Sequence, residues 1–370
     1  WLKPQSQAAP SVATASVFPA VLPNAGPGAM SRIPSRVSRL VRHIAVSATP
    51  AESLPISGGA HLEDASRHLS AKGFAHLQLG ASASIHELEA AARRLMGLRD
   101  NGGGEYNGGG GVTRDTISNS GFLNGSAGAP SELPVHFHNE MAYSSSVPRY
   151  LAFAMLTQAQ EGGTTLLADN VQVTRVMSEG LRQKLRDLGA CYVRNLNDES
   201  ERGSPDFFMS WQAAFQTADV QEALKKGNTA ASITQRQQGS KRLWQAAWSP
   251  VFIEHPVHGE LYFSSILNRH GSWLDAHRVF GKMPLAKRPY HCVWGDGAEF
   301  SEEELLELRQ VHEQCTMKVK LDQGDVLVMD NLRVAHGRTS FNGDRLIGLL
   351  LSDMIQREYH PPAAFRALAA

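Results

Sequence analysis

GDVLVMDNLRVAH, residues 324–336, joins a short apolar run to a polar turn and a histidine, and this combination decides the fold. The run 326–329 is continuous, as expected for a strand that is buried on both faces. Asp330 and Asn331 form a polar turn that leads the chain to His336. His336 can therefore supply a metal ligand just beyond a buried strand.

The next stretch, GRTSFNGDR, ends at Arg345, where the apolar strand 346–351 begins. A guanidinium that enters a buried strand is costly unless an anion meets it. A carboxylate of a bound small molecule is a fitting anion, because arginine forms a planar bidentate pair with a carboxylate. Arg338 is the competing candidate, but it lies two residues after His336, where we expect it to brace the turn.

VHFHNE, residues 135–140, places His136, His138 and Glu140 at alternate positions. On an extended strand, residues two apart project to the same face about 6.5 to 7 Å apart, so a histidine and a carboxylate can hold one ion. With His336 as third ligand, two imidazoles and one carboxylate would occupy one face of an octahedron. That arrangement leaves three positions open and is typical of non-haem iron(II) oxygenases.

The rest of the chain predicts a mixed α and β fold with a double-stranded β-helix (jelly-roll) core, a helical cap and insertions. Many short strands with intervening insertions favour two packed sheets over a repeating strand-helix sheet. Residues 61–98 predict the cap: a helix that ends at Gly73, a strand at 74–79 and a helix at 85–98. We expect further strands at 150–156, 164–168, 190–193, 251–253, 261–263, 316–319 and 325–329, and helices at 170–188, 220–226 and 301–315.

Composition limits the class of partner. The 370 residues include 36 basic and 36 acidic side chains, so no net charge favours nucleic acid or an anionic membrane. No apolar run approaches the roughly 18 to 20 residues that a membrane-spanning helix needs. The three cysteines are widely spaced and form no C-x-x-C pair, which favours a reduced compartment over a zinc or redox centre. A small-molecule partner is the better expectation.

The first 51 residues contain no Asp or Glu but are rich in Ser, Ala, Pro and Arg. This is the composition of an organelle transit peptide, with a disordered tail as the alternative. The chain begins at Trp1, and Met30 is a plausible natural start. We therefore expect a targeting or disordered segment at 1–56, a catalytic domain at 57–358 and a tail at 359–370. The expected location is a plastid or mitochondrion, and otherwise the cytoplasm.

Five stretches in order carry a resemblance to a known family: FHNEMAY, EGGTTLLAD, SWQAAFQT, GDVLVMDN and HGRTSFNGDR. Together they resemble the taurine dioxygenase superfamily, and within it the clavaminate synthase-like branch. The resemblance covers about residues 62–353. It implies that His138, Glu140 and His336 bind Fe(II), and that Arg345 and Thr165 hold the far carboxylate of 2-oxoglutarate.

Two features depart from the common pattern of the superfamily. Many members use Asp as the carboxylate ligand, whereas this chain has Glu140, as the clavaminate synthase-like branch does. His138 and His336 are separated by 198 positions (336 minus 138), which is long for the family core and implies an insertion. The polar segment 217–241 is the expected insertion, either as a lid over the substrate or as a mobile surface loop.

Residues beside these motifs have competing interpretations. His136 is expected in the core or behind the ligands rather than on the metal. Asn331 is expected to orient the turn beneath His336. Trp211 favours core packing over substrate contact. Arg114, after the glycine cluster at 102–111, either meets an anionic substrate or is a solvated loop charge. Three polar residues that follow a predicted strand are candidates to face the substrate: Ser264, Ser265 and Asn268.

The resemblance implies a dioxygenase that hydroxylates or desaturates a small polar molecule and releases succinate and CO2. Because Glu140 fills the carboxylate position, a halide finds no vacancy, so halogenation is disfavoured. The expected partners are that substrate, 2-oxoglutarate and O2, with no nucleic acid or membrane; the oligomeric state is not indicated. Two alternatives remain: a cupin-like metal-binding barrel without catalysis, and a zinc hydrolase with the same ligands, which leaves Arg345 unexplained.

Overall fold

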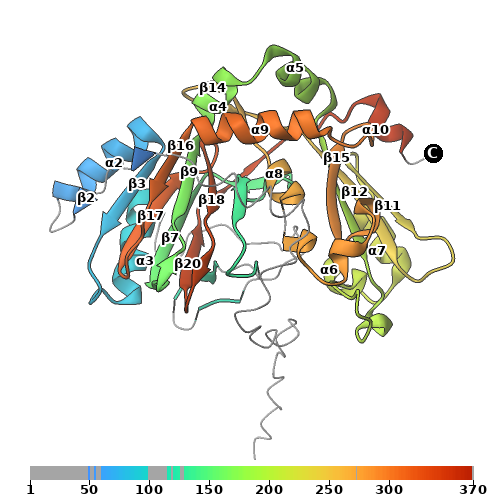
Figure 1. The fold of residues 1–370 in the computed structure, drawn as a ribbon, viewed down its shortest axis with the longest axis horizontal. Coiled ribbons are helices and arrows are strands. Elements are labelled where there is room, and N and C mark those ends of the chain that lie inside the picture. Colours follow the sequence, from blue (N-terminus) through green and yellow to red (C-terminus); the bar gives the residue numbers. More distant parts are fainter. Residues whose placement is uncertain are drawn as a thin grey trace, which may run out of the picture. The chain divides into compact units, whose positions relative to one another are not determined.

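The computed structural model describes residues 49–50, 54–55, 60–98, 115–117, 120–125, 129–271 and 273–368. The chain divides into two compact units, Trp1–Ile33 and Pro34–Ala370, and every described residue belongs to the second. Most of the expected targeting segment, the glycine cluster and Arg114 lie outside the described residues. The described part is a mixed α and β structure (Figure 1).

The helices contain between five and 13 residues. They are α2 (Ala60–Lys72), α3 (Ile85–Met96), α4 (Asn170–Val176), α5 (Glu179–Leu188), α6 (Trp211–Phe215), α7 (Val220–Gly227), α8 (Ile266–His270), α9 (Glu302–Gln314) and α10 (Ala363–Ala367). Four single turns of 3-10 helix are η2 (Glu199–Glu201), η3 (Trp273–Asp275), η4 (Phe280–Lys282) and η5 (Leu285–Lys287).

The strands of the described residues form three larger sheets and three pairs. The six-stranded sheet has the order β2 (Leu54–Pro55), β3 (Phe74–Gln78), β17 (Asp325–Asp330), β7 (Tyr150–Thr157), β20 (Leu346–Leu351) and β4 (Leu123–Asn124). The five-stranded sheet has the order β1 (Thr49–Pro50), β16 (Thr316–Val319), β9 (Thr165–Asp169), β18 (Val334–Arg338) and β5 (Val135–His138). The four-stranded sheet has the order β11 (Ser232–Arg236), β12 (Leu243–Ser249), β10 (Ala190–Leu196) and β15 (Tyr290–Trp294). The pairs are β13 (Phe252–His255) with β14 (Gly259–Tyr262), β8 (Glu161–Gly162) with β19 (Phe341–Asn342), and β6 (Ser146–Pro148) with β21 (Met354–Gln356).

Strand β17 shows why the apolar run at its centre is buried on both faces. Successive side chains of a strand point to opposite faces. Leu327 and Met329 join the core cluster that includes residues of both the six-stranded and five-stranded sheets. Val326 and Val328 face the other way and pack with residues of α2 and α3, which cover the six-stranded sheet (Figure 1). The polar turn after β17 then carries the chain into β18, in the other sheet.

The expected helix at 170–188 is two helices. Ser178 separates them with an extended backbone, and its side chain accepts a hydrogen bond from the backbone N–H of Leu181. A serine in this position satisfies a donor that the first turn of a helix leaves unpaired, so it favours a new start. α4 therefore ends at Val176 and α5 begins at Glu179.

The segment 217–241 contains regular secondary structure, so the expectation of a surface loop throughout is wrong. It contains α7 and β11, and β11 pairs antiparallel with β12 along five residues. Ala223 of α7 is buried with Leu196 and Leu243 of the four-stranded sheet. The insertion predicted from the ligand spacing is thus the edge of an ordered sheet.

Both ends of the expected catalytic domain contact the sheets. Before residue 57, β1 pairs with β16 and β2 pairs with β3. After residue 358, Phe365 of α10 is buried with Cys191 and Trp248 of the four-stranded sheet, so the expected tail is packed onto the fold. Among the described residues, no helix has the length and apolar character needed to cross a membrane.

Candidate metal centre

Three side chains meet beside the five-stranded sheet, two of them from its strands and the third from the turn that follows β5. His138 is the last residue of β5, and it lies opposite His336 of β18 in the antiparallel register. The rings of these histidines are 4.3 Å apart between centroids. Glu140 Oε2 lies 4.0 Å from His336 Nε2. One ligand atom from each residue lies within 4.8 Å of the others, and no second such cluster of His, Cys, Asp or Glu occurs in the described ranges.

Glu140 reaches this point by a route that the strand geometry did not predict. β5 ends at His138, so Glu140 does not project from the same extended strand. The backbone N–H of Asn139 donates to Ser264 O at 2.9 Å, and Met141 has a left-handed φ of 59°. The carboxylate is therefore presented by a turn that is bonded to a distant segment.

His138 has a defined tautomer. Its Nδ1 lies 2.9 Å from the carbonyl oxygen of His136, so Nδ1 must donate and Nε2 is left to act as a ligand. The side chain of His136 is buried and does not belong to the three-residue cluster. Its ring packs so closely on Gly271 that a Cβ there would lie only 2.2 Å away. Burial, with a smaller contribution from Arg309, lowers the pKa of His136 to about 4. The part of His136 that fixes the tautomer of His138 is thus its backbone carbonyl group, not its side chain.

The side chain of Asn331 makes hydrogen bonds to the backbone at and near Glu140. Its Oδ1 accepts from the N–H of Glu140 at 2.8 Å, and its Nδ2 donates to the carbonyl oxygens of Glu140 at 3.1 Å and Pro148 at 3.0 Å. Asn139 adds a second link, because its Nδ2 donates to Asn331 O at 2.7 Å. Both asparagines have no exposed surface. Asn331, in the turn between β17 and β18, thus positions the backbone of Glu140.

Replacing Asn331 with alanine should loosen Glu140 and destabilise the fold. The change leaves one N–H and two carbonyl groups without their buried partner, which we expect to cost about 2 to 4 kcal/mol in the free energy of unfolding. Supporting residues of this kind typically change metal affinity by about 10 to 100-fold. Thermal unfolding and iron titration measure the two effects. The exposed Asn342→Ala is the matched control, and equal behaviour of the two variants would contradict the role of Asn331.

The aromatic packing behind β5 includes a buried histidine. His312 of α9 stacks on Phe137 with ring centroids 5.4 Å apart, and its Nδ1 donates to Leu308 O at 2.7 Å. Burial lowers the pKa of His312 to about 4, although the Leu308 hydrogen bond opposes the shift. The neutral ring therefore packs directly behind the strand that carries His138.

Acidification should weaken the fold through His312. Its pKa in the folded chain lies below the ordinary value of 6.5, so between pH 6.5 and pH 4 the unfolded chain binds a proton that the folded chain does not. The free energy of unfolding should therefore fall across this window, by up to about 3 kcal/mol from this residue. Urea unfolding at several pH values should show a shallower pH dependence in His312→Phe. The exposed His360→Phe should keep the wild-type slope; a common slope in all three proteins would refute the assignment.

Arg345 lies where β20 begins, beside the paired strands β8 and β19. Its Nε is buried and has no hydrogen-bond partner among the described residues. A Cβ on Gly163 would lie 3.3 Å from that nitrogen, so the glycine lets the backbone come close. Burial lowers the pKa of Arg345 to about 10. The group stays charged near neutral pH and has a donor to offer an anion.

Arg338 and Thr165 are opposite each other across β18 and β9. Arg338 donates to the carbonyl oxygens of Thr339 at 3.0 Å and Pro130 at 3.4 Å, which is the bracing role expected of it. Arg338 and Arg345 both face the Phe341 ring, with Cζ 4.6 Å and 5.6 Å from its centroid. Thr165 is almost fully buried in the same strand pair. Arg338 therefore lies near Arg345, and of these two arginines Arg345 is the one with a buried donor that lacks a hydrogen-bond partner among the described residues.

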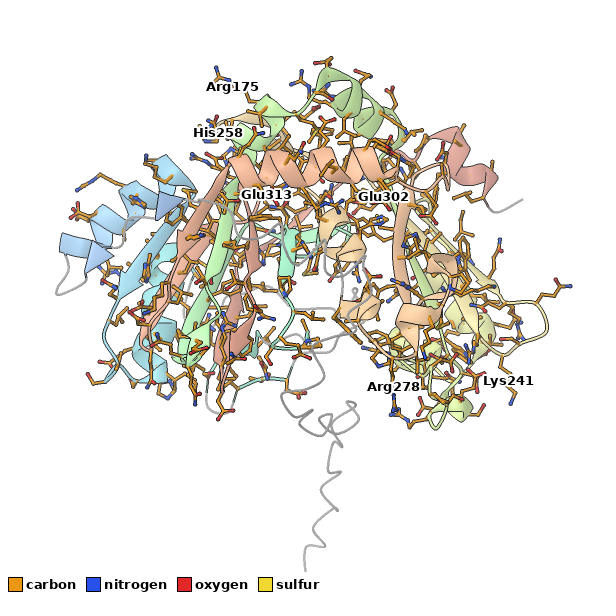
Figure 2. The ribbon with its side chains drawn as sticks, in the orientation of Figure 1. Arg175, Lys241, His258, Arg278, Glu302 and Glu313 are labelled. Atoms are coloured by element: carbon orange, nitrogen blue, oxygen red, sulfur yellow. The ribbon has the colours of Figure 1, made fainter. Side chains whose placement is uncertain are left out.

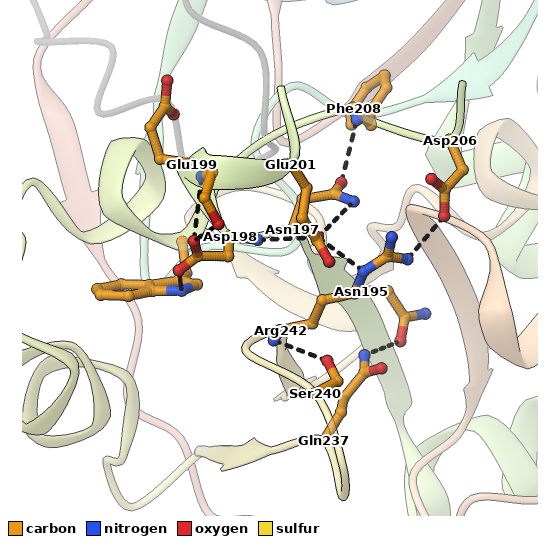
Figure 3. Close-up of polar contacts among 12 residues, drawn as sticks. Asn195, Asn197, Asp198, Glu199, Glu201, Asp206, Phe208, Gln237, Ser240 and Arg242 are labelled. Atoms are coloured by element: carbon orange, nitrogen blue, oxygen red, sulfur yellow. Dashed lines mark hydrogen bonds and ion pairs between the residues drawn. The ribbon is translucent and has the colours of Figure 1, made fainter. Parts of the chain in front are cut away.

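Trp211 donates a hydrogen bond to Asp198, which belongs to the set of polar contacts in Figure 3. Its indole N–H donates to Asp198 Oδ2 at 3.2 Å, and Gln212 Nε2 donates to the same oxygen at 2.9 Å. Hydrogen bonds from Ser200, Gln212 and Trp211 lower the pKa of Asp198 to about 2, although desolvation opposes them. Trp211 is also buried in a core cluster with Leu196 and Leu243, as the packing interpretation predicts.

The two serines that precede α8 make hydrogen bonds to Asn139, in the turn that presents Glu140. Ser265 Oγ donates to Asn139 O at 3.3 Å, and the Ser264 N–H donates to Asn139 Oδ1 at 3.2 Å. Both serines are buried, whereas Asn268 is partly exposed on α8. Sequence reasoning missed Asn139 and His312; the position of Asn139 between His138 and Glu140 was the available signal for the first.

A family model, two curated relatives and a solved structure are similar to this chain. The family model described as Taurine catabolism dioxygenase TauD, TfdA family matches residues 47–350. One curated relative is the dapdiamide synthesis protein DdaC of Enterobacter agglomerans, which is 26% identical over 61% of this chain and 68% of its own length. Another is a clavaminate synthase-like protein of Arabidopsis thaliana, which is 22% identical over 59% of this chain and 65% of its own length. The chain thus spans about two thirds of each relative. A crystal structure of AAD-2 with Mn(II) and N-oxalylglycine is 13% identical, over 85% of this chain and 99% of that chain, with a TM-score of 0.44.

Proposed function

This chain belongs to the taurine catabolism dioxygenase TauD, TfdA family and is an Fe(II)- and 2-oxoglutarate-dependent dioxygenase, and we propose that His138, Glu140 and His336 hold its iron. The observation that carries the proposal is the convergence of two imidazoles and one carboxylate within 4.8 Å. This donor set suits iron(II) and leaves coordination positions open for other ligands. Bound iron supplies the chemistry that couples O2 reduction and 2-oxoglutarate decarboxylation to oxidation of a substrate.

The protein's own contribution is to fix the ligands and exclude water. His138 presents Nε2 because its Nδ1 is committed to the carbonyl oxygen of His136. The ring of His336 packs edge-on against Phe153, with centroids 5.3 Å apart, and this contact limits its rotation. Asn331 and Asn139 hold the backbone that presents Glu140. Such supporting contacts set ligand orientation in metal sites.

We infer that Arg345 binds the far carboxylate of 2-oxoglutarate, with Thr165 contributing a hydroxyl. The unused buried Nε of Arg345 supports this, because a buried guanidinium donor needs an acceptor and a carboxylate provides two. Thr165 is adjacent to β18 in the register and nearly fully buried. The co-substrate would thus be anchored at the end away from the metal.

The reaction that we propose is hydroxylation or desaturation of a small polar molecule, with release of succinate and CO2. Glu140 occupies the carboxylate place, which supports these outcomes over halogenation. A metal-binding barrel without catalysis would not need an unused buried arginine donor, and neither would a zinc hydrolase. Arg345 is therefore the residue that favours the dioxygenase site over these alternatives.

Succinate release tests the proposed function. The purified protein is incubated with 2-oxoglutarate and air, with iron(II), with zinc or with a chelator, and with a library of small polar compounds. Succinate that forms only with iron and rises with particular compounds supports the proposal. Hydrolysis that requires zinc, or no iron-dependent succinate with any compound, would overturn it.

For the fold, we propose that the five-stranded and six-stranded sheets form a double-stranded β-helix around the core cluster that they share. We also propose that residues 1–56 contain a segment that directs the chain to a plastid or mitochondrion. The composition of that segment supports this, and the family match starts only at residue 47. Expression of residues 1–56 fused to a fluorescent protein would test the targeting, and diffuse fluorescence would contradict it.

A further inference from the structure

The chain after β20 runs back along the residues that follow Glu140. β21 pairs antiparallel with β6, which begins six positions after Glu140 (146 minus 140). Beyond this strand pair, the backbone N–H of Arg357 donates to Ser145 O at 2.7 Å. These residues lie outside the range that the family model matches, which ends at residue 350. The C-terminal segment, residues 352–359, therefore reaches the turn that presents Glu140.

The side chain of Arg357 joins this turn to the end of β12. Its Nη1 donates to the carbonyl oxygen of Ala142 at 3.0 Å and to Ser249 Oγ at 3.1 Å. Its Nη2 donates to the carbonyl oxygen of Pro250 at 2.7 Å. Ser249 Oγ in turn donates to the same Ala142 oxygen at 2.8 Å. The carbonyl group two residues after Glu140 is thus held by a guanidinium and a hydroxyl group from distant parts of the chain.

Two rings also contact the guanidinium of Arg357. Its Cζ lies 5.0 Å from the centroid of Phe263 and 5.4 Å from that of Tyr359. Among the described residues, no carboxylate forms an ion pair with it. An arginine stays charged in proteins, so the carbonyl oxygens are the groups that balance this partly buried cation. The guanidinium therefore has one defined position, set by carbonyl groups and rings.

The turn needs support from outside because its backbone is strained. Met141, which directly follows Glu140, has a left-handed φ of 59° and is buried. A residue with a side chain keeps this conformation only where surrounding contacts hold it. Asn331 binds the backbone at Glu140, and Arg357 binds the backbone at Ala142. The left-handed residue is thus held on both sides.

We propose that Arg357 is a positioning residue for the metal centre, whose guanidinium fixes the Ala142 carbonyl group and so holds Glu140 where its carboxylate can bind the ion. This deepens and rests on the proposed function, because it takes Glu140 as a metal ligand. It gives the C-terminal segment a role in metal affinity. By linkage, metal binding stabilises the Arg357 contacts as much as those contacts favour metal binding.

Cobalt(II) is a suitable probe, because it lies next to iron(II) in the order of affinities for nitrogen and oxygen ligands and its absorption spectrum reports coordination geometry. The metal-free protein is titrated with cobalt(II) well below its Tm. Arg357→Ala should bind cobalt(II) at least about tenfold more weakly, with an altered spectrum, as expected when a residue that supports a ligand is lost. Arg357→Lys keeps the charge and a donor group, so it should recover part of the affinity.

Two exposed arginines provide matched controls. Arg366 lies on α10, near Arg357 in the sequence, and Arg278 projects from the surface (Figure 2). Alanine at either position should leave cobalt(II) affinity and spectrum as in the wild type. Thermal unfolding of each metal-free variant is measured in parallel. A lower Tm in Arg357→Ala with unchanged cobalt(II) affinity and spectrum is the result of a purely structural contact, and would overturn the proposal.

Hydrogen exchange provides a test that needs no variant, so it remains decisive if Arg357→Ala does not fold. Cobalt(II) should slow amide exchange in wild-type peptides that cover residues 354–359, as well as in those that cover 138–144. Peptides that cover the surface turn 237–241 should exchange at the same rate with and without the metal. Exchange at 354–359 that the metal leaves unchanged would refute the coupling.

The wild-type titration separates this inference from the proposed function. A wild type that binds cobalt(II) no better than Glu140→Ala does would overturn the ligand set, and this inference with it. Stronger binding by the wild type that Arg357→Ala fully retains would overturn this inference alone. None of these measurements requires turnover, so they are independent of iron-dependent succinate release.

Discussion

Glu140→Ala is expected to lose iron-dependent succinate release by at least about 100-fold, because changes to residues that only support metal ligands already cost up to that factor. The variant leaves two imidazoles, which hold iron(II) more weakly than two imidazoles and a carboxylate. Glu140 is almost fully buried, so its removal also leaves a cavity that water can enter. Metal content after dialysis and succinate formation with iron in excess separate loss of binding from loss of turnover.

Glu254→Ala is the matched control for this experiment. Glu254 is an exposed carboxylate on β13, and its removal should leave metal content unchanged. Glu140→Asp keeps the charge on a shorter side chain and should restore part of the metal binding. Full activity and full iron content in Glu140→Ala would refute the proposed ligand set.

Arg345→Ala should raise the KM for 2-oxoglutarate by about 30-fold or more. Truncating one partner of a buried charge pair costs about 2 to 5 kcal/mol, and each 1.4 kcal/mol corresponds to roughly tenfold in affinity. Arg345→Lys should recover little, since an ammonium group cannot reproduce the planar bidentate pair. Initial rates of succinate formation over a range of 2-oxoglutarate concentrations give the KM.

Arg338→Ala distinguishes the two neighbouring arginines. Its guanidinium already donates to two backbone carbonyl groups, so its loss should lower thermal stability with a smaller change in KM. Arg338→Ala with the larger KM effect would reverse the assignment of the co-substrate site. A fold weakened by the substitution is recognised separately, by its lower Tm.

The sequence predicted elements best where apolar residues follow a simple pattern. The strands expected at 316–319 and 346–351 coincide with β16 and β20. Strand β12 was not predicted, because LWQAAWS mixes polar, small and aromatic residues, and its burial follows from pairing with β10 and β11. The order within the polar segment 217–241 was not predicted for the same reason, since its strand β11 is held by pairing with β12.

The proposed ligands could be chosen from spacing and residue type, but their geometry could not. His138 and His336 were selected from motifs, and the structure brings them together through strand register. The turn at Glu140 depends on hydrogen bonds between Asn139 and Ser264, 125 positions apart (264 minus 139), which no local pattern reveals. Arg357 lies beyond the last motif, so nothing in the sequence distinguished it.

The pairing of β5 with β18 determines when, during synthesis of the chain, the proposed ligands can come together. His138 and Glu140 leave the ribosome long before His336, which is made 198 residues after His138 (336 minus 138). At typical rates of translation this delay is roughly 10 to 40 s. Throughout that time an ion could find only part of the ligand set that we propose. Iron would therefore be acquired after translation, and its supply in the compartment where the chain folds would set the active fraction.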